Sequence, residues 1–353
     1  MKKKILLAFD NPGGGHAVCS LLTELGKIKE AELVIYSGRL SEKFTGEFHF
    51  RKINTMITDI EAEEIINSNL PDMLITATGG GNAEQLLRNT AFEKNIKSVV
   101  ILDFWKDYTR RWKYSTYGLN EMKDIVCVMD ELTKKEMAAE GFPEEKIIAT
   151  GHPYLDLLFD SNKNGKELIP AGSENDKVKL LFLSQPPGII GVNKYREHPL
   201  KTLLESVEEI SGRNKTVYSI VIKPHPLETE LSELIKTSED FNFNKEKIEI
   251  RIADKSEDTT DLILSSDIII GYNTIAMFES RSFNKRTISL SLVPVRESLT
   301  AAMKDAGIEI IPVNKEQITE CLNSIPVRKN PDGVFKGGIS NCIKVILKEL
   351  NLN

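Results

Sequence analysis

The 353-residue sequence predicts an α/β fold built from two Rossmann-like domains that face each other across a cleft. Short apolar runs rich in Ile and Val alternate with amphipathic segments along most of the chain. Several of these runs show no polar alternation, as expected for parallel strands that are buried on both faces. The alternation pauses once, at a polar stretch, and then restarts. At about 150 residues per domain, the length also suits two domains.

The first domain is predicted over residues 1–160. Its strand-length runs are KILLAF, ELVIYS, DMLITA, KSVVILDF, DIVCVM and KIIAT. Between them, DIEAEEIINSN has Asp59 near its start, and NAEQLLRNTAFEKN can be capped by Asn82, so both are predicted to be helices. This order of elements indicates one doubly wound parallel sheet.

The polar stretch SNKNGKELIPAGSENDK, residues 161–177, is predicted to be a linker because it interrupts the pattern with Gly and Pro. The second domain then covers residues 178–353. Its predicted strands are KLLFLSQ, VYSIVIKP, KIEIRIA, SDIIIGY, KRTISLSL and IEIIPV. The final helix, NCIKVILKELNLN, is expected to cross back to the first domain.

Charge and composition exclude several classes of function. A net charge of −6 and a pI near 5.6 argue against a nucleic-acid partner. The apolar run after the initial lysines breaks at Asp10, which is too soon for a signal peptide or a membrane span. The cysteines are scattered without metal or disulfide spacing, so a reducing cytoplasm is expected. The basic residues Arg110, Arg111 and Lys113 would allow a peripheral position at the inner membrane face.

Two glycine-rich segments follow predicted strands of the first domain. FDNPGGGHAVCS contains Gly13, Gly14, Gly15 and His16, and TATGGGNAEQ contains Gly79, Gly80 and Gly81. Ligands of such sheets lie beyond the carboxyl ends of the strands, so backbone N–H groups here are predicted to contact an anionic or hydroxyl-rich ligand. The spacing differs from that of a dinucleotide fingerprint. His16 is a candidate general base. The alternatives are that the glycines only form tight turns and that His16 caps a helix or packs in the core.

A third segment, ILDFWKDYTRRWKY, gathers Asp103, Trp105, Tyr108 and Arg111 after another strand. Aromatic faces can stack on sugars, and arginine can clamp carboxylate or phosphate groups, so these residues are candidates for binding an acceptor. The alternative is that they belong to an amphipathic segment packed on the sheet.

The second domain carries candidates for binding a phosphorylated donor. Lys223 and His225 end a strand in SIVIKPHP, and Ser184 ends KLLFLSQ. In SSDIIIGYNTIAMFES, a strand ends at Gly271, and Asn273 and Thr274 precede a helix whose free N–H groups could meet a phosphate. Glu279, in that helix, is a candidate for contacting ribose hydroxyls.

These motifs resemble those of GT-B glycosyltransferases, in which two Rossmann-like domains transfer a sugar from a nucleotide donor. GGGH resembles the acceptor loop of that class. KPHP followed by SDIIIGYNTIAMFE is similar to bacterial sialyl- and polysialyltransferases, capsular transferases and CDP-glycerol-type transferases. TGHPYLDLL also resembles a segment of the more distant UDP-GlcNAc 2-epimerases.

The resemblance implies a metal-independent glycosyltransferase of surface-glycan or glycoprotein biosynthesis that uses a CMP-, CDP- or UDP-linked sugar. Its acceptor would be a hydroxyl of a glycan, a lipid-linked molecule or a protein. The catalytic base would be His16, Asp10 or Asp103. His225, Lys223 and Thr274 would stabilise the phosphate of the departing nucleotide. Neither a cofactor nor a metal is expected.

Two alternatives remain. One is a nucleotide-sugar 2-epimerase or hydrolase of the UDP-GlcNAc 2-epimerase type, although VPVRESLTAAM and GYNT depart from the Thr-Glu-Arg-Pro-Glu motif and the Ser-Gly-Gly turn of that family. The other is a protein that binds a nucleotide sugar without catalysis.

Overall fold

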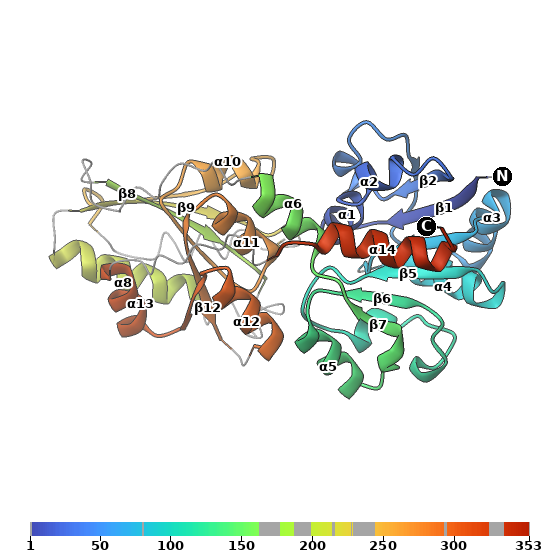
Figure 1. Ribbon diagram of the computed structural model, residues 1–353. Helices are drawn as coiled ribbons and strands as arrows, with labels where there is room; N and C mark the ends of the chain where they lie inside the picture. Colours follow the sequence, from blue (N-terminus) through green and yellow to red (C-terminus); the bar gives the residue numbers. More distant parts are fainter. Residues whose placement is uncertain are drawn as a thin grey trace. The chain divides into compact units, whose positions relative to one another are not determined.

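The computed structural model describes residues 2–79, 81–161, 177–186, 199–213, 216–226, 228, 244–292, 295–324 and 335–352. The chain divides into two compact units, each with its own parallel sheet (Figure 1). Unit 1 comprises Met1–Ser161, Arg296–Leu299 and Phe335–Asn353, and unit 2 comprises Asn162–Val295 and Thr300–Val334. The predicted α/β class with two Rossmann-like sheets is thereby confirmed. Gly80 and most of the predicted linker, residues 162–176, lie outside the described residues.

Unit 1 contains a seven-stranded sheet in its described part, with the order β3-β2-β1-β4-β5-β6-β7. The strands are β1 (Lys3–Phe9), β2 (Ala31–Ser37), β3 (Arg51–Lys52), β4 (Met73–Thr76), β5 (Lys97–Ile101), β6 (Ile125–Val128) and β7 (Ile147–Ala149). All neighbouring pairs are parallel, and Ile5 of β1 lies opposite both Leu33 and Met73. The strand order reverses between β1 and β4, which is the position where open α/β sheets bind ligands.

The helices of unit 1 cover both faces of this sheet. They are α1 (Pro12–Cys19), α2 (Leu22–Gly26), α3 (Asp59–Asn69), α4 (Ala83–Glu93), α5 (Glu131–Ala139), α6 (Pro153–Ser161) and α14 (Gly338–Leu350). Alternate residues of β1 enter two different apolar clusters: Ile5 and Leu7 pack with α1, α2 and α14, whereas Leu6 and Ala8 pack with α3 and α4. Burial on both faces explains why KILLAF shows no polar alternation.

Unit 2 contains a six-stranded parallel sheet in its described part, with the order β10-β9-β8-β11-β12-β13. The strands are β8 (Lys177–Leu183), β9 (Val217–Lys223), β10 (Ile248–Ile252), β11 (Ile268–Gly271), β12 (Arg286–Ser291) and β13 (Glu309–Pro312). The helices are α8 (Pro199–Arg213), α10 (Thr259–Leu264), α11 (Ile275–Ser282), α12 (Glu297–Asp305) and α13 (Lys315–Asn323). The apolar residues of α8 and α13 pack against the sheet in one core.

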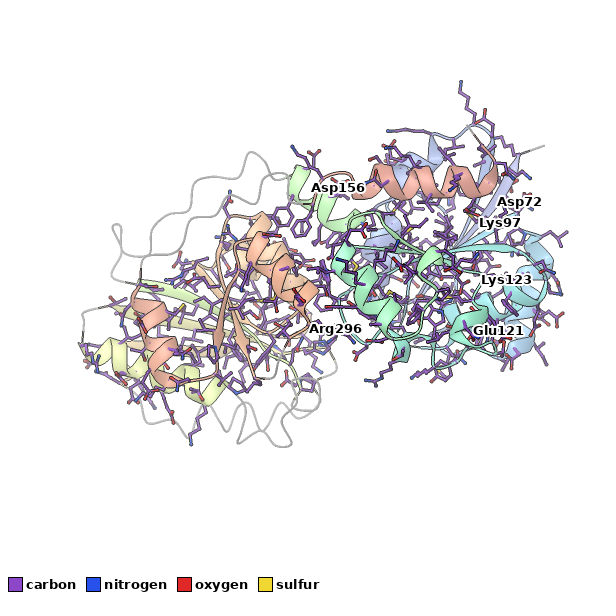
Figure 2. All side chains as sticks on the ribbon, turned by 60° about the horizontal axis from the view of Figure 1, so that its bottom comes forward. Asp72, Lys97, Glu121, Lys123, Asp156 and Arg296 are labelled. Carbon is purple, nitrogen blue, oxygen red and sulfur yellow. The ribbon has the colours of Figure 1, made fainter. Side chains whose placement is uncertain are left out.

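The C-terminal helix α14 is part of unit 1, although the second sheet precedes it in the sequence. Asp156 of α6 accepts hydrogen bonds from the backbone N–H groups of Gly337 (3.2 Å) and Ile339 (3.0 Å), and it lies beside the start of α14 in Figure 2. A Cβ atom on Gly338 would lie 2.8 Å from the backbone carbonyl of His152. Only glycine therefore permits this close approach of α14.

Replacing Gly338 with alanine should lower the free energy of unfolding of unit 1 by about 1–3 kcal/mol, because the new methyl group meets backbone atoms that cannot move freely. Both tryptophans of the protein, Trp105 and Trp112, lie in unit 1, so urea denaturation followed by tryptophan fluorescence reports on this unit. Lys344→Ala, at an exposed position of the same helix in unit 1, is the control. An equal loss of stability in both variants would contradict the packing argument.

Candidate functional site

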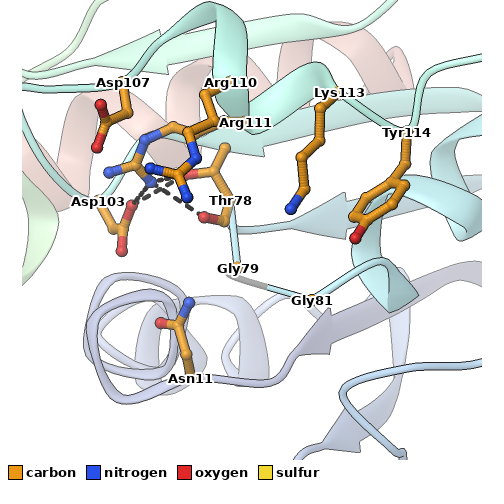
Figure 3. Close-up of a pocket in the computed structure, with 10 residues that line it drawn as sticks. All are labelled: Asn11, Thr78, Gly79, Gly81, Asp103, Asp107, Arg110, Arg111, Lys113 and Tyr114. Carbon is orange, nitrogen blue, oxygen red and sulfur yellow. Dashed lines mark hydrogen bonds and ion pairs between the residues drawn. The ribbon is translucent and has the colours of Figure 1, made fainter. Parts of the chain in front are cut away.

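A pocket of about 250 Å³ lies at the switch point of unit 1, over the carboxyl ends of β4 and β5 (Figure 3). Asp103 lies toward one end of the pocket and Tyr114 toward the other. The lining residues are Asn11, Thr78, Gly79, Gly81, Asp103, Asp107, Arg110, Arg111, Lys113 and Tyr114. The structure thus brings together residues from three segments that the sequence singles out.

Asp103 and Asp107 are the two carboxylates that line this pocket, and Asp103 is the one held by hydrogen bonds. Its Oδ1 atom accepts a hydrogen bond from the hydroxyl of Thr78 (2.8 Å) and forms an ion pair with Arg111. Arg111 is itself fixed, because its guanidinium also donates to the backbone oxygens of Lys106 (2.9 Å) and Thr78 (3.0 Å). Asp103 is thus held in one orientation by groups that belong to the protein.

The first glycine segment forms the first turn of helix α1. Asn11 caps this helix, and its Oδ1 atom accepts a hydrogen bond from the N–H of Gly14 (2.7 Å). A Cβ on Gly14 would lie 2.6 Å from Ala77, and one on Gly15 would lie 2.6 Å from Ser41. These glycines therefore let α1 pack closely against its neighbours.

The space beside the first turn of α1 is occupied by a carboxylate of the protein. A Cβ on Gly13 would lie 2.6 Å from Oδ2 of Asp103. The positive end of the helix dipole favours a negative charge at this position, and Asp103 supplies it. The geometry consequently argues against direct anion binding by Gly13, Gly14 and Gly15. In the second glycine segment, Gly79 and Gly81 do line the pocket.

Two further carboxyl groups, those of Asp10 and Glu84, are buried behind Gly79. Their exposed fractions are 2% and 3%. Glu84 accepts hydrogen bonds from the backbone N–H groups of Asp10 (3.0 Å) and Gly79 (2.8 Å), so it ties the loop after β1 to the loop after β4. Burial raises the pKa of Asp10 to about 6, with Asp103 acting in the same direction, and burial beside Asp10 raises the pKa of Glu84.

Sequence reasoning missed Glu84. It is the second residue of α4, where an acidic side chain ordinarily faces solvent and stabilises the helix start. Its burial depends on the close approach of Asp10 and Gly79, which no local pattern reveals.

His16 has an environment that does not suit a general base. Its ring lies 3.8 Å from the ring of Phe44 and 4.1 Å from the ring of Tyr154. Burial lowers the pKa of His16 to about 4, so the imidazole is neutral and weakly basic at pH 7. The packing role that was the alternative for His16 fits this geometry better.

The aromatic residues predicted to stack on a sugar are inside the protein. Trp105 is 1% exposed and donates its indole N–H to Asp130 (2.6 Å). Tyr108 is fully buried, and its hydroxyl lies 2.8 Å from Glu136. Neither ring offers a face to a ligand, so the predicted acceptor contacts of Trp105 and Tyr108 do not fit the structure.

In unit 2, the predicted phosphate contact of Lys223 does not fit either. Its ammonium group donates to the backbone oxygens of Asp254 (2.8 Å), Lys255 (3.1 Å) and Glu257 (2.7 Å). An ammonium group has three protons, and these three carbonyls use them all. Lys223 therefore fixes the loop after β10.

Ser184 and His225 are brought together by Glu228, a fully buried residue that the sequence reasoning missed. Glu228 accepts hydrogen bonds from the hydroxyl of Ser184 (3.0 Å) and from the backbone N–H of His225 (3.1 Å). Glu228 thus fixes the backbone at His225 and joins the ends of β8 and β9.

The segment between β11 and α11 contains the predicted phosphate-site residues Asn273 and Thr274. Thr274 occupies the N-cap of α11, and its buried hydroxyl makes no hydrogen bond with the described residues. Asn273 accepts a hydrogen bond from Ser289 (3.0 Å). A Cβ on Gly271 would lie 3.0 Å from Leu183, so glycine permits close packing there. Glu279 is half-buried on α11.

In the described part of the chain, no cluster of three or more His, Cys, Asp or Glu residues could hold a metal ion. No described helix combines the length and apolar character that crossing a membrane requires.

Comparison with known proteins relates this fold to nucleotide-sugar enzymes. Neither a family model nor a curated protein sequence matches the chain. Among solved structures, the S. aureus MnaA–UDP complex has a TM-score of 0.68 and 17% identity, covering 99% of this chain and 98% of that one. The Methanocaldococcus jannaschii UDP-GlcNAc 2-epimerase in complex with UDP-GlcNAc and UDP has a TM-score of 0.67 and 16% identity, covering 98% and 99%.

A glycosyltransferase of kitacinnamycin is also similar, with a TM-score of 0.57 and 11% identity over 99% of this chain and 100% of that one. These identities establish the fold, and they confirm the GT-B resemblance at that level. Because several UDP-GlcNAc 2-epimerase structures match over nearly the whole chain with higher scores than the glycosyltransferase, the predicted glycosyltransferase function is contradicted.

Replacing Asp10 with asparagine should change how stability depends on pH. The pKa of Asp10 is raised from 3.8 to about 6 on folding, so the native state binds more protons than the unfolded state between these values. The stability of the parent protein should therefore fall as pH rises from 4 to 6. Asparagine does not titrate, so Asp10→Asn should gain up to about 3 kcal/mol relative to the parent between pH 4 and pH 8.

Urea denaturation at several pH values measures this difference. Asp72→Asn is a control of opposite sign, because hydrogen bonds from Lys3 and Lys4 lower the pKa of Asp72. Its deficit relative to the parent should be present at neutral pH and should shrink as pH falls below 3.8, the ordinary pKa from which that of Asp72 is lowered. A flat difference for Asp10→Asn would show that Asp10 is not a buried, high-pKa carboxyl.

Proposed function

We propose that this protein is an epimerase that inverts C2 of a nucleotide-linked sugar, with the sugar bound in the pocket of unit 1. The observation that carries the proposal is the fixed carboxylate of Asp103 at the switch point of that unit. The likeness of the whole chain to UDP-GlcNAc 2-epimerases supports it, and a UDP-linked amino sugar is therefore the first substrate to test.

Inversion at C2 requires that a proton leave one face of the sugar and that another arrive on the opposite face. The electron pair of the C2–H bond can form a C1=C2 double bond while the C1–O bond to UDP breaks; UDP then adds back to C1 as a proton reaches C2 from the other face. A positioned carboxylate can accept the first proton. Thr78 and Arg111 both hold Oδ1 of Asp103, whereas Oδ2 receives no hydrogen bond from the described residues. Oδ2 of Asp103 is accordingly the proposed proton acceptor.

The pocket volume agrees with a sugar ligand. At about 250 Å³, it is smaller than the ~300–1,000 Å³ typical of sites for drug-sized ligands. A monosaccharide suits this space better than a complete nucleotide sugar does. In unit 2, taken by itself, we propose that the N-terminus of α11 with Thr274 and Asn273 binds the phosphate groups of a nucleotide, because the helix dipole favours negative charge there.

Incubating the protein with UDP-GlcNAc in D2O tests the proposed function. We expect deuterium to enter C2 and a second, epimeric UDP-sugar to form without any acceptor, both observed by NMR. Release of free sugar without exchange would indicate a hydrolase, and a ligand-induced rise in melting temperature without turnover would indicate a binding protein. Either result would contradict the epimerase.

Asp103→Asn should reduce the rate of C2 exchange by about 10²-fold or more, because the amide cannot accept the proton. UDP affinity should change little, since Thr274 and Asn273 are the residues proposed to bind the nucleotide phosphates. Asp59→Asn, a change at an exposed position of α3, serves as the control and should leave both quantities unchanged. Full exchange activity in Asp103→Asn would remove Asp103 from the reaction.

Thr274→Ala should weaken UDP binding by about tenfold, because one hydrogen bond to a charged phosphate contributes about 1.5 kcal/mol or more. Isothermal titration calorimetry measures the affinity. Thr260→Ala, at an exposed position of α10, is the matched threonine control. Unchanged UDP affinity in Thr274→Ala would place the phosphates elsewhere.

A further inference from the structure

Asp10 and Glu84 place two carboxyl groups against one another beneath Gly79. A Cβ on Gly79 would clash with Oδ1 of Asp10 and would lie 2.7 Å from Oε1 of Glu84, so both oxygens border the same small space. The Glu84 carboxyl is within hydrogen-bonding reach of Asp10. The two side chains come from different elements, since Asp10 follows β1 and Glu84 belongs to α4.

Donors to this pair are scarce among the described residues. Both oxygens of Asp10 are buried and neither has a hydrogen-bond partner by geometry, although the backbone N–H of Gly81 lies near enough to lower the pKa of Asp10. Both oxygens of Glu84 already accept backbone N–H groups, so the two carboxyls face one another as acceptors. Two adjacent buried carboxylates cannot both be ionised at low cost, whereas one proton between them turns repulsion into a hydrogen bond.

We propose that Asp10 and Glu84 share one proton and that Glu84 is a positioning residue, which uses this proton to hold the loops after β1 and β4 in place beside Asp103. The role in positioning Asp103 rests on the proposed function, whereas the shared proton does not. The raised pKa values of both groups agree with it.

The charged groups around the pair leave the proton in place. Asp103, from the end of β5, adds negative charge near both carboxyls and so favours protonation. Arg88 of α4 acts in the opposite direction on Glu84, but its guanidinium donates to Thr76 (2.9 Å) and to the backbone oxygen of Ala77 (3.0 Å). Arg111 is paired with Asp103.

The pair also predicts how pH affects the site. Loss of the shared proton at alkaline pH leaves two carboxylates in contact, and their repulsion separates Asp10 from Glu84. Because Glu84 binds the backbone of Asp10 and of Gly79, this separation loosens both loops. Catalysis should therefore fall on the alkaline side as the pair ionises.

Infrared spectroscopy of the ligand-free protein tests the shared proton directly. At pH 7 the parent should show the carbonyl band of a buried, protonated carboxyl, and this band should disappear reversibly at higher pH. Asp10→Asn should lack the band, because its amide donates a hydrogen to Glu84 without titrating while Glu84 keeps both of its backbone hydrogen bonds. Absence of the band in the parent, or its persistence in Asp10→Asn, would overturn the proposal.

Kinetics of C2 exchange test the positioning role. Asp10→Asn should keep at least a third of the parent kcat and should lose the alkaline decline, because Glu84 keeps its two backbone hydrogen bonds, whereas Glu84→Ala should lose at least tenfold in kcat at every pH with little change in KM. Equal pH profiles in the parent and Asp10→Asn would overturn this role. If no variant, including the parent, exchanges deuterium, the proposed function fails while the infrared result still decides the shared proton.

Discussion

The site of unit 1 depends on the burial of carboxyl groups at one edge of a parallel sheet. Parallel strands that are covered on both faces bring their carboxyl ends to a common edge, and the reversal of strand order opens space there. Asp10, Glu84 and Asp103 occupy this edge with exposed fractions of 2%, 3% and 9%. Two of these carboxyls are held by different groups. Asp103 is held by Arg111 and Thr78, and Glu84 is held by two backbone N–H groups.

Close packing at glycine makes this burial possible. Gly79 leaves room for Asp10 and Glu84, and Gly13 leaves room for Asp103. Larger residues at position 79 would push the loops apart and admit water, which would lower the raised pKa values of Asp10 and Glu84 toward their ordinary range. The glycine-rich segments therefore determine the proton chemistry of the site through packing.

The sequence was sufficient to predict the sheets and the segments that meet at the switch point, because strand period and loop composition are local properties. KILLAF and SDIIIGY are strands as expected, and Asp103 and Gly79 meet in one pocket. The partners of individual side chains could not be predicted, because they depend on tertiary contacts. Lys223 bonds three carbonyls of a loop about 30 residues away, and Trp105 bonds Asp130. A motif indicates where such residues lie along the strand but not whether they face a ligand.

The proposed function places the sugar of a nucleotide-linked substrate in the pocket beside Asp103. A crystal structure of the Asp103→Asn variant grown with UDP-GlcNAc tests this placement, since this variant should bind the substrate without converting it. We expect the sugar ring in the unit 1 pocket, with C2 within about 3.5 Å of the residue 103 side chain, the distance expected for reacting groups. A sugar bound elsewhere, or one whose C2 faces away from residue 103, would contradict it.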